Sequence, residues 1–494
     1  MILSAYPLIV VAAIIGFVLI PSRRILHLLA AVESAAFLVV TGVLILTVPL
    51  PATDLGPWNG IFFADHFGVF LAVVSGVVFF FASLYAGGYT ERLMETGELN
   101  PNRLRLFYSG LALLQLFVTL AFFADNLGLF WILAELTTVF SALLVAILAA
   151  RENIDAALKY IFIASVAMLF SFAGVIFVFE AARITLGEGT LTWTVLVQHA
   201  SSFPPTLLFA AFVFLFIGFA AKSGVVPFHT WLPDAHSKAP SAVSAILSGA
   251  LLNVGIYGII RAYSLVHQTP FAEKASLILF VSGFLSVGVA SLAMLYQTNL
   301  KKLIAFSSIE NMGLILLGIG VGSPVALFWV VIHMLAHSLT KAALFLSAGV
   351  LHRQYRSHEP GADDQIVDVF DLQPTAAWGV IVGTLAIVGM PPFPIFYTKF
   401  FLLTQVATVS PWLLAATLVL IMIAVAGMAR FLIREFSARS EANVQQPHRY
   451  IVPLGMRLSF VLLIVIVTVQ GLWFPVQEIA VISQIVAELG FGGV

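Results

Sequence analysis

The sequence predicts an all-α membrane protein whose helices cross the bilayer about fourteen times. Of its 494 residues, 61% are hydrophobic and only 10% are charged, whereas about 25% of a soluble domain is charged. The apolar residues fall in runs long enough to span a bilayer as helices. Basic residues gather in every second loop between these runs, as they do in polytopic membrane proteins.

Each apolar run of about 17 residues or more predicts one membrane-spanning helix. The seventh and twelfth runs contain Gly and Pro interruptions, so we expect broken helices there. The expected helices cover residues 3–20, 26–48, 67–88, 105–124, 127–149, 156–181, 206–222 (continuing broken to about 236), 240–264, 275–296, 303–321, 325–351, 375–405 (broken near 391–394), 411–433 and 455–486.

The positions of the 23 Lys and Arg residues predict the orientation. Most lie in or beside odd-numbered loops, and only Arg183, Arg261 and Lys274 lie in even-numbered loops. Since cytoplasmic loops are enriched in basic residues, we expect the odd loops to face the cytoplasm. Both termini would then lie on the outer, periplasmic face of a bacterial inner membrane. No cleavable signal is expected, because Arg23 and Arg24 follow the first apolar run rather than precede it.

Gly224 and Pro227 interrupt the seventh helix, and the run GMPPFP at 389–394 interrupts the twelfth. Broken helices in corresponding positions of two halves indicate the internal repeat of a transporter. Helices 4–8 and 9–13 would form two five-helix units, and the odd number of helices inverts the second unit in the membrane. The expected divisions are 1–104 for helices 1–3, 105–265 and 275–434 for the two units, and 455–494 for the C-terminal helix.

Lys222 ends a long apolar stretch, immediately before the first break. A Lys at bilayer depth costs at least about 2.5–3.5 kcal/mol on insertion scales, so it indicates a functional site. Glu135, in LGLFWILAELTTVFSALL of helix 5, is the evident partner. Pairing would keep Lys222 charged and separation would let it release its proton, which predicts a proton switch. The alternative is a static ion pair that joins two helices, but buried pairs are often poor stabilisers.

His333, His337 and Lys341 follow one another at four-residue spacing in helix 11. They therefore share one stripe, about 12 Å long, and could pass a proton along it. A zinc site is one alternative, because His pairs at this spacing bind zinc, but the stripe lacks the Glu of HExxH and a third ligand. Two ordinary core histidines are the other alternative.

Three further side chains extend this line. Lys399 follows the break of helix 12 and is expected inside the membrane, although snorkelling to the interface is its alternative reading. Lys302 and Glu310 belong to helix 10, and both are weaker candidates. Glu310 lies about 10 Å into the membrane, measured along the helix from its predicted start. His229 borders the first break and could continue the path toward helix 8.

Several classes of function are excluded or disfavoured. The chain has no Cys, which excludes thiolate-ligated iron–sulfur clusters and CxxC redox motifs. Phosphate-binding loops and nucleophile triads are absent, and a net charge of −1 gives no case for nucleic acid. We therefore expect no cofactor, no metal and no catalytic chemistry in this chain. Electrons, if involved, would travel in a partner subunit.

The run AKSGVVPFHTWLPDAHSKAPSAVSAILSG closely resembles the signature of the antiporter-like membrane subunits of respiratory complex I, Mrp-type cation/proton antiporters and group 4 membrane-bound hydrogenases. LKKLIAFSSIENMG, HMLAHSLTKAALFLSAG and LAIVGMPPFPIFYTKFF resemble its later motifs. The resemblance covers roughly helices 3–13. It implies fourteen helices in an inverted repeat and a proton channel along a central hydrophilic axis.

The resemblance also implies roles for individual residues. Glu135 and Lys222 match the paired switch residues, Lys341 with its two histidines the central relay, and Lys399 the exit-side residue. Asn253 stands where some complex I subunits carry a helix-8 Lys, and Glu310 where many have Gln or Ser. Both features look like the hydrogenase-4, or formate hydrogenlyase, membrane subunits. A Glu is frequent there near the position of Lys399, and this sequence departs from that pattern.

The leading hypothesis is a proton-translocating subunit of a multisubunit oxidoreductase, hydrogenase-4-like or NADH:quinone oxidoreductase-like. Its expected partners are further antiporter-like and channel subunits, a peripheral redox arm and the lipid bilayer. The alternative hypothesis is a redox-independent transporter subunit, either of an Mrp-type Na⁺/H⁺ antiporter or of an inorganic-carbon uptake system. A scaffold whose channel no longer conducts is a third reading, against which the line of ionisable residues argues.

Overall fold

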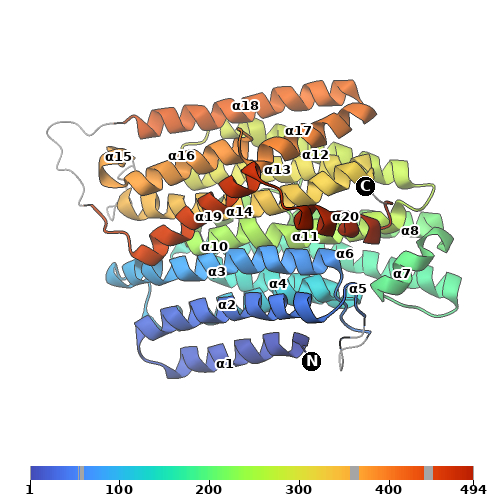
Figure 1. Ribbon diagram of the computed structural model, residues 1–494, viewed down its shortest axis with the longest axis horizontal. Helices are drawn as coiled ribbons and strands as arrows, with labels where there is room; N and C mark the ends of the chain where they lie inside the picture. The colour runs from blue at the N-terminus through green and yellow to red at the C-terminus, as the bar shows by residue number, and fades with distance from the viewer. Residues whose placement is uncertain (1, 54, 56–59, 356–365, 439–448, 493–494) are drawn as a thin grey trace.

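The computed structural model describes residues 2–53, 55, 60–355, 366–438 and 449–492. Nearly all of this part of the chain is helical, and its extended pairings are three isolated bridges rather than strands. The long helices run side by side as one bundle (Figure 1). Helices satisfy their own backbone hydrogen bonds, as the hydrocarbon of a bilayer requires. The all-α prediction is confirmed.

Thirteen helical spans in the described part of the chain are long and apolar enough to cross a membrane. The shorter helices α16 and α17 together take the place of the broken twelfth helix. In chain order the helices are η1 Ile2–Ser4, α1 Ala5–Leu19, α2 Arg23–Thr47, α3 His66–Glu95, α4 Pro101–Phe123, α5 Leu127–Val145, α6 Arg151–Leu186, α7 Trp193–His199, η2 Ala200–Ser202, α8 Pro205–Lys222, α9 Trp231–Lys238, α10 Ser241–Ile246, the π-helical η3 Leu247–Leu251, α11 Leu252–Val266, α12 Ala272–Met294, α13 Leu300–Val321, α14 Pro324–Tyr355, α15 Val369–Leu372, α16 Pro374–Val388, α17 Pro394–Val409, α18 Pro411–Phe436, α19 Leu454–Leu472 and α20 Val476–Glu488.

Both expected helix breaks are present. α8 ends at Lys222 and the chain resumes as α9, while α16 ends at Val388 and resumes as α17. At each break a glycine adopts a left-handed backbone, with φ of 65° at Gly224 and 89° at Gly389. That conformation is strained for residues with a Cβ, which explains why glycine stands at both positions. Each break also contains one cis X–Pro bond, before Pro227 and before Pro392.

The two predicted five-helix units repeat the same helix contacts. In the first, α4 packs on α5, α5 on α6, and α6 on both α8 and α9. In the second, α12 packs on α13, α13 on α14, and α14 on both α16 and α17. The last helix of each unit also touches its first, as α11 touches α4 and α18 touches α12. These contacts agree with the predicted repeat, while the residues chosen as unit boundaries stay a prediction.

The deepest part of the bundle consists of the α10–η3–α11 span, α13 and α14. These spans are largely buried against other helices, whereas most of α18 and α1 is open to the surroundings. Polar side chains on the buried spans cannot reach lipid headgroups, so they must find partners within the bundle. The functional candidates on α13 and α14 lie in this region.

The C-terminal helix differs from the prediction of one span over 455–486. α19 ends at Leu472, and a separate helix, α20, begins at Val476. Pro475 explains the difference, because proline lacks an N–H donor and its ring disfavours a helical conformation in the residue before it. α20 packs on α3 and α14, and its Glu488 binds His66 at 2.6 Å.

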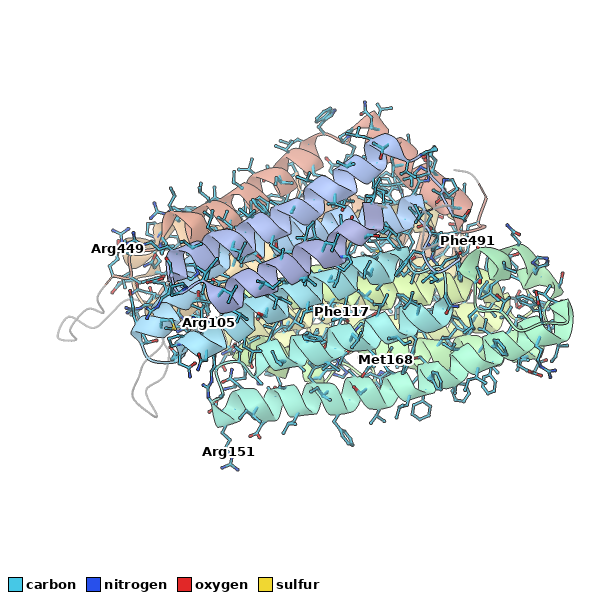
Figure 2. All side chains as sticks on the ribbon, turned by 90° about the horizontal axis from the view of Figure 1, so that it is seen from below. Arg105, Phe117, Arg151, Met168, Arg449 and Phe491 are labelled. Atoms are coloured by element: carbon cyan, nitrogen blue, oxygen red, sulfur yellow. The ribbon has the colours of Figure 1, made fainter. Side chains whose placement is uncertain are left out.

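The ends of the bundle agree with the alternation of charge. Arg105, Arg151 and Arg449, which belong to odd-numbered loops, lie at one end, and Phe491 near the C-terminus lies at the other (Figure 2). The basic residues of loops far apart in the sequence are thus brought to one face, as the positive-inside pattern requires.

Candidate functional site

Glu310 and Lys399 form a buried ion pair in the second unit. Nζ of Lys399, on α17, donates to Oε1 of Glu310, on α13, at 2.9 Å. Both side chains are less than a tenth exposed. Removing two charges from water costs several kcal/mol per ion, which only good geometry and further hydrogen bonds offset. Lys399 therefore does not snorkel, and Glu310 is a full member of the site.

A hydrogen-bonded chain continues from this pair to α14. The second carboxylate oxygen of Glu310 accepts a bond from Asn311 Nδ2 at 2.6 Å. Asn311 Oδ1 lies 3.0 Å from Nε2 of His333, and Nδ1 of His333 lies 2.8 Å from the hydroxyl of Thr398. Thr398 precedes Lys399 on α17, so the chain connects three helices. His333 is fully buried and bonded at both ring nitrogens.

Lys341 and His337 lie further along the same stripe of α14, and both are fully buried. Nζ of Lys341 donates to the backbone carbonyl of Ile304 at 2.7 Å and to the hydroxyl of Ser307. Neither ring nitrogen of His337 has a hydrogen-bond partner among the described residues. Buried polar groups are normally hydrogen-bonded to protein or to ordered water. The two ring nitrogens of His337 are therefore places where ordered water could bind and connect His333 with Lys341.

The predicted Glu135–Lys222 pair is not in contact. Nζ of Lys222 donates instead to Thr138 Oγ1 at 2.9 Å, and Glu135 Oε1 accepts from Ser165 at 2.5 Å. Glu135 Oε2 is buried without a partner in the described chain. Because Thr138 follows Glu135 by three residues on α5, both lie on the same helix face. The bond to Thr138 therefore brings Lys222 to the face of α5 that carries Glu135, without a contact between the two charges.

The three remaining predicted residues, Asn253, His229 and Lys302, lie in three different surroundings. Asn253 is fully buried and donates to Ser338 of α14 at 2.8 Å, which puts it beside the stripe. His229 lies half-buried in the first break, and its Nδ1 has no partner among the residues described. Lys302 lies outside the line, because it pairs at 3.2 Å with the partly exposed Asp234 of α9.

Sequence reasoning missed several polar residues of the site. Asn311, Thr398 and Thr138 make the contacts that join the charged side chains. His236 of α9 is fully buried, stacks on Phe345 of α14 with ring centroids 4.5 Å apart, and has two unpartnered nitrogens. Their positions in the sequence could have indicated these four residues. Each lies within four residues of a predicted candidate or in the signature run.

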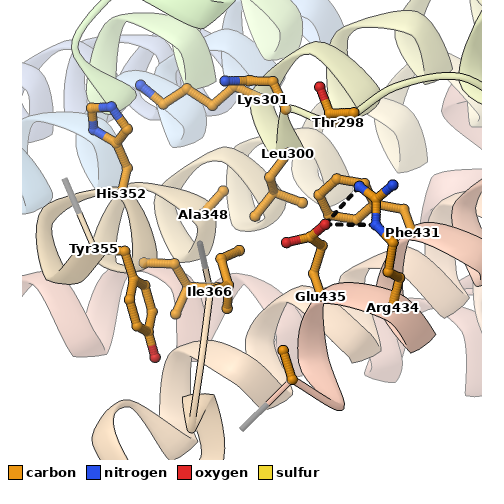
Figure 3. Close-up of a pocket in the computed structure, with 13 residues that line it drawn as sticks. Thr298, Leu300, Lys301, Ala348, His352, Tyr355, Ile366, Phe431, Arg434 and Glu435 are labelled. Atoms are coloured by element: carbon orange, nitrogen blue, oxygen red, sulfur yellow. Dashed lines mark hydrogen bonds and ion pairs between the residues drawn. The ribbon is translucent and has the colours of Figure 1, made fainter. Parts of the chain in front are cut away.

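A cavity of about 690 Å³ opens beside Lys301, at the start of α13. His352 and Tyr355 of α14 and the bonded Arg434–Glu435 pair of α18 also line it (Figure 3). Lys301 itself donates to the carbonyl of Ala239 at 2.9 Å. Ile304, whose carbonyl binds Lys341, comes one helical turn after Lys301. The cavity therefore ends close to the Lys341 end of the stripe.

The described residues contain no cluster of three or more His, Asp or Glu side chains suited to a metal ion. His333 and His337 share a helix face, but His333 is already bonded through both nitrogens. The bonds of His333 to Thr398 and Asn311 occupy the nitrogens that a metal ion would need.

A helical bundle with two broken helices and a buried line of ionisable groups has the architecture of a membrane transporter or channel subunit. The chain belongs to a specific family of that class. Residues 124–424 match the family described as "NADH:quinone oxidoreductase/Mrp antiporter, TM", so the chain is an antiporter-like membrane subunit of the hydrogenase-4, complex I and Mrp type.

Curated relatives agree with this assignment. The chain is 35% identical over 367 residues to a hydrogenase-4 component F homolog of Methylacidiphilum infernorum, which covers 73% of this chain and 76% of the relative. It is 29% identical to hydrogenase-4 component B of Escherichia coli, covering 74% of this chain but 54% of that protein. NADH-quinone oxidoreductase subunit M of Pseudomonas aeruginosa is 39% identical over 194 residues, covering 39% of this chain and 36% of that subunit.

Solved structures share the fold at low sequence identity. A chain of the membrane-bound sulfane sulfur reductase, an archaeal respiratory membrane complex, superposes with a TM-score of 0.84 at 20% identity and covers 99% of this chain and 96% of its own. A chain of the Mrp complex from Dietzia gives a TM-score of 0.81 at 19% identity, covering 99% and 97%. The fold-class prediction is confirmed by these likenesses.

Proposed function

We propose that this chain translocates protons across the cytoplasmic membrane as one subunit of a multisubunit oxidoreductase, of the hydrogenase-4 or NADH:quinone oxidoreductase type. Electron transfer would take place in partner subunits of a peripheral arm and drive proton movement here. The hydrogenase-4 relatives and the complex I relatives support this assignment. Further antiporter-like membrane subunits would be its neighbours in the bilayer.

One observation carries the proposal: a continuous hydrogen-bonded chain crosses the core of the second unit. It runs from Lys399 through Glu310 and Asn311 to His333. Each link is within 3.0 Å, and the Asn311 amide holds the Glu310 carboxylate and the His333 ring in place, while the proton itself would move between the titratable groups through intervening water. Histidine and lysine in this chain can each exist with or without the proton.

The first unit supplies the coupling switch in this proposal. Lys222 is bonded to the neutral hydroxyl of Thr138, so no direct carboxylate contact holds it charged. A rotation of Glu135 or Lys222 toward the other would form the ion pair and favour the charged form of Lys222. Separation would release the proton toward Lys341. The unpartnered nitrogens of His236 and His337 support a water-assisted path between them.

The cavity beside Lys301 supports a second point of access. It ends one helical turn from the carbonyl that binds Lys341. Through it, water could reach the Lys341 end of the stripe from one face of the bundle. On the proposed orientation that face is cytoplasmic, because Arg105, Arg151 and Arg449 lie at the end of the odd-numbered loops.

The orientation has its own test. The chain contains no Cys, so single cysteines introduced at Asn102 and at Ser202 can be labelled without background. Both positions are exposed and lie at helix ends, beside predicted loops of opposite parity. A membrane-impermeant maleimide added to intact cells should label Ser202→Cys only. Labelling of Asn102→Cys alone would reverse the assignment.

The function is tested with the Lys222→Ala variant in the purified complex, reconstituted in proteoliposomes. We expect electron transfer to continue while the number of protons moved per electron falls. Lys274→Ala is the matched control, because Lys274 is an exposed lysine in the first turn of α12. An unchanged proton-to-electron ratio in Lys222→Ala would refute the proposal. Proton movement that proceeds without any electron donor would favour the redox-independent alternative.

A further inference from the structure

Helices α1 to α4 contain a second set of buried polar side chains. These helices lie together at one side of the bundle (Figure 1). They precede residues 124–424, which match the family, and the proton path through α5, α13, α14 and α17 uses none of their residues. Buried polar groups in a membrane bundle are costly, so a set of them requires an explanation.

The polar residues recur at intervals of seven on three helices. Seven residues make almost two helical turns, so members of one helix share a face and lie about 10 Å apart. Contacts between the helices join the members at matching levels. The set consists of His27, Ser34 and Thr41 on α2, Ser83 and Thr90 on α3, and Tyr108 and Gln115 on α4.

The first level connects the surface with the interior. The carboxylate of Glu91 is about half exposed and lies 3.1 Å from Nε2 of His27. Nδ1 of His27 lies 2.6 Å from the hydroxyl of the fully buried Tyr108, which in turn lies 3.2 Å from the hydroxyl of Thr90. Every group in this chain can both give and accept a proton or a hydrogen bond.

The second level surrounds a buried carboxyl group. The hydroxyl of Ser34 binds Gln115 Oε1 at 2.7 Å, Ser83 Oγ at 3.0 Å and, at 3.5 Å, Oε2 of Glu33. Glu33 is 5% exposed, and its Oε1 has no hydrogen-bond partner among the described residues. Gln115 Nε2 is likewise without one. An unpaired acceptor and an unpaired donor in one buried cluster fit a bound proton and an ordered water.

No ion pair of Glu33 is found in the described part of the chain. Of the ionisable groups on the elements packed around it, His27 and Glu91 bind each other, Tyr6 of α1 bonds to Thr41 at 2.8 Å, and Arg92 pairs with Glu95 on α3. The buried hydroxyl of Tyr85 on α3 has no partner among the described residues. A carboxylate buried without a cation is strongly disfavoured against its protonated form. Glu33 therefore differs from Glu310, whose charge Lys399 balances.

The helix faces between the two levels carry small residues on α2 and α3, and Leu111 together with Ala112 on α4. Ala30, Ala86 and Ala112 occupy the intervening positions on α2, α3 and α4, and each is buried. They lie three or four residues from the polar members on either side and hence on the same faces. Bulk at these intervening positions is therefore confined to Leu111 of α4.

We propose that Glu33 is a proton-binding site that exchanges protons with the surface at Glu91 through His27 and Tyr108. This route is separate from the path through Lys222 and Lys399. It gives the N-terminal helices a proton-accepting group of their own, which neither the comparisons nor the proposed function assigns.

The protonation of Glu33 can be tested by carbodiimide labelling of the complete complex in membranes. Dicyclohexylcarbodiimide reacts with protonated carboxyl groups in apolar surroundings, and mass spectrometry of peptides locates the adduct. We expect Glu33 to be labelled about tenfold more than Glu310, the equivalent of one unit of pKa. Glu310 is the internal control because it is equally buried but paired. Equal or weaker labelling of Glu33 would overturn the proposal.

The route is tested by infrared spectroscopy after a jump in pH. The carboxyl band that disappears in Glu33→Gln identifies the group, and its rate of change reports proton exchange. We expect Tyr108→Phe and His27→Phe to slow that rate about tenfold or more, as for loss of a relay group. Tyr85→Phe, another fully buried tyrosine of the same helix region, should keep the wild-type rate.

A wild-type rate in both Tyr108→Phe and His27→Phe would refute the route. The Lys222→Ala variant separates this inference from the proposed function. Its Glu33 band should be unchanged, whatever its effect on proton pumping.

Discussion

The two five-helix units hold equivalent charged pairs in different states. In the second unit, a Glu of the unit's second helix and a Lys after the broken helix's interruption are in direct contact at 2.9 Å. In the first unit, Glu135 lies on the corresponding second helix and Lys222 on the broken helix, but before its interruption, and each bonds to a hydroxyl instead. The comparison teaches that the repeat preserves the charges while allowing their contact to vary. A pair that can open and close is what a switch requires.

The largest expected effect is on the closed pair. Lys399→Met or Glu310→Gln should each lower the free energy of unfolding by about 3–5 kcal/mol, because one buried charge or polar partner is left without its counterpart. The double variant should recover most of this loss. The measurement is a denaturant titration in detergent for the two single variants and the double. Additive losses would contradict a direct pair.

His333→Leu should have the next largest effect, on proton movement. It removes a group that can carry a proton, together with the two hydrogen bonds that hold it in place, and loss of such a group should slow proton transfer about a hundredfold. The measurement is the initial rate of proton uptake by proteoliposomes at fixed electron flux. His199→Leu, on the partly exposed α7, is the control. A wild-type rate in His333→Leu would remove this residue from the path.

Glu135 and Lys222, the pair that is not in contact, should show a small interaction free energy in the denaturant titration used for Glu310 and Lys399. A double-mutant cycle of Glu135→Gln and Lys222→Met should give an interaction below about 1 kcal/mol, since the groups do not touch and such pairs contribute little. The titration used for Glu310 and Lys399 applies unchanged. A coupling as large as that of the second unit would mean that the first pair is closed as well.

The smallest effect concerns Asp125, which lies between α4 and α5 and binds the start of α7. Asp125 lies outside the spans, and its carboxylate accepts bonds from the backbone and hydroxyl of Thr194, both at 3.0 Å. Burial raises the pKa of Asp125, and these bonds only partly offset it. Since the folded-state pKa exceeds the unfolded value, stability should fall as pH rises from about 4 through the folded-state pKa.

Asp125→Asn should abolish this dependence, and the difference from wild type should stay near 1 kcal/mol or less. Thermal unfolding between pH 4 and 7 measures it. If wild type and Asp125→Asn respond identically to pH, burial does not perturb the Asp125 carboxyl group.

Much of the fold could be predicted because lipid allows few solutions. Run length, charge alternation and the two Gly/Pro breaks sufficed for the spans and for both broken helices. The end of α19 was missed although Pro475 is visible, because the apolar run continues through it. Residue spacing also placed His333, His337 and Lys341 on one stripe, since a helix has a fixed period.

The contacts between helices could not be predicted in the same way. Glu310 and Lys399 are 89 residues apart, and nothing local in the sequence indicates that they meet. Conversely, Glu135 and Lys222 were the evident pair by charge, yet Thr138 binds the lysine. Charge identifies which groups need partners, while the packing of α5, α13 and α17 decides which partners they obtain.

The central claim is that one proton path passes through both units, including the closed pair. The most direct measurement is the proton-to-electron ratio of the complex that carries Glu310→Gln together with Lys399→Met. This double variant keeps the fold, because neither charge is left alone, so a loss of pumping cannot be attributed to unfolding. We predict normal electron transfer with a reduced proton-to-electron ratio, and a wild-type ratio would contradict the account.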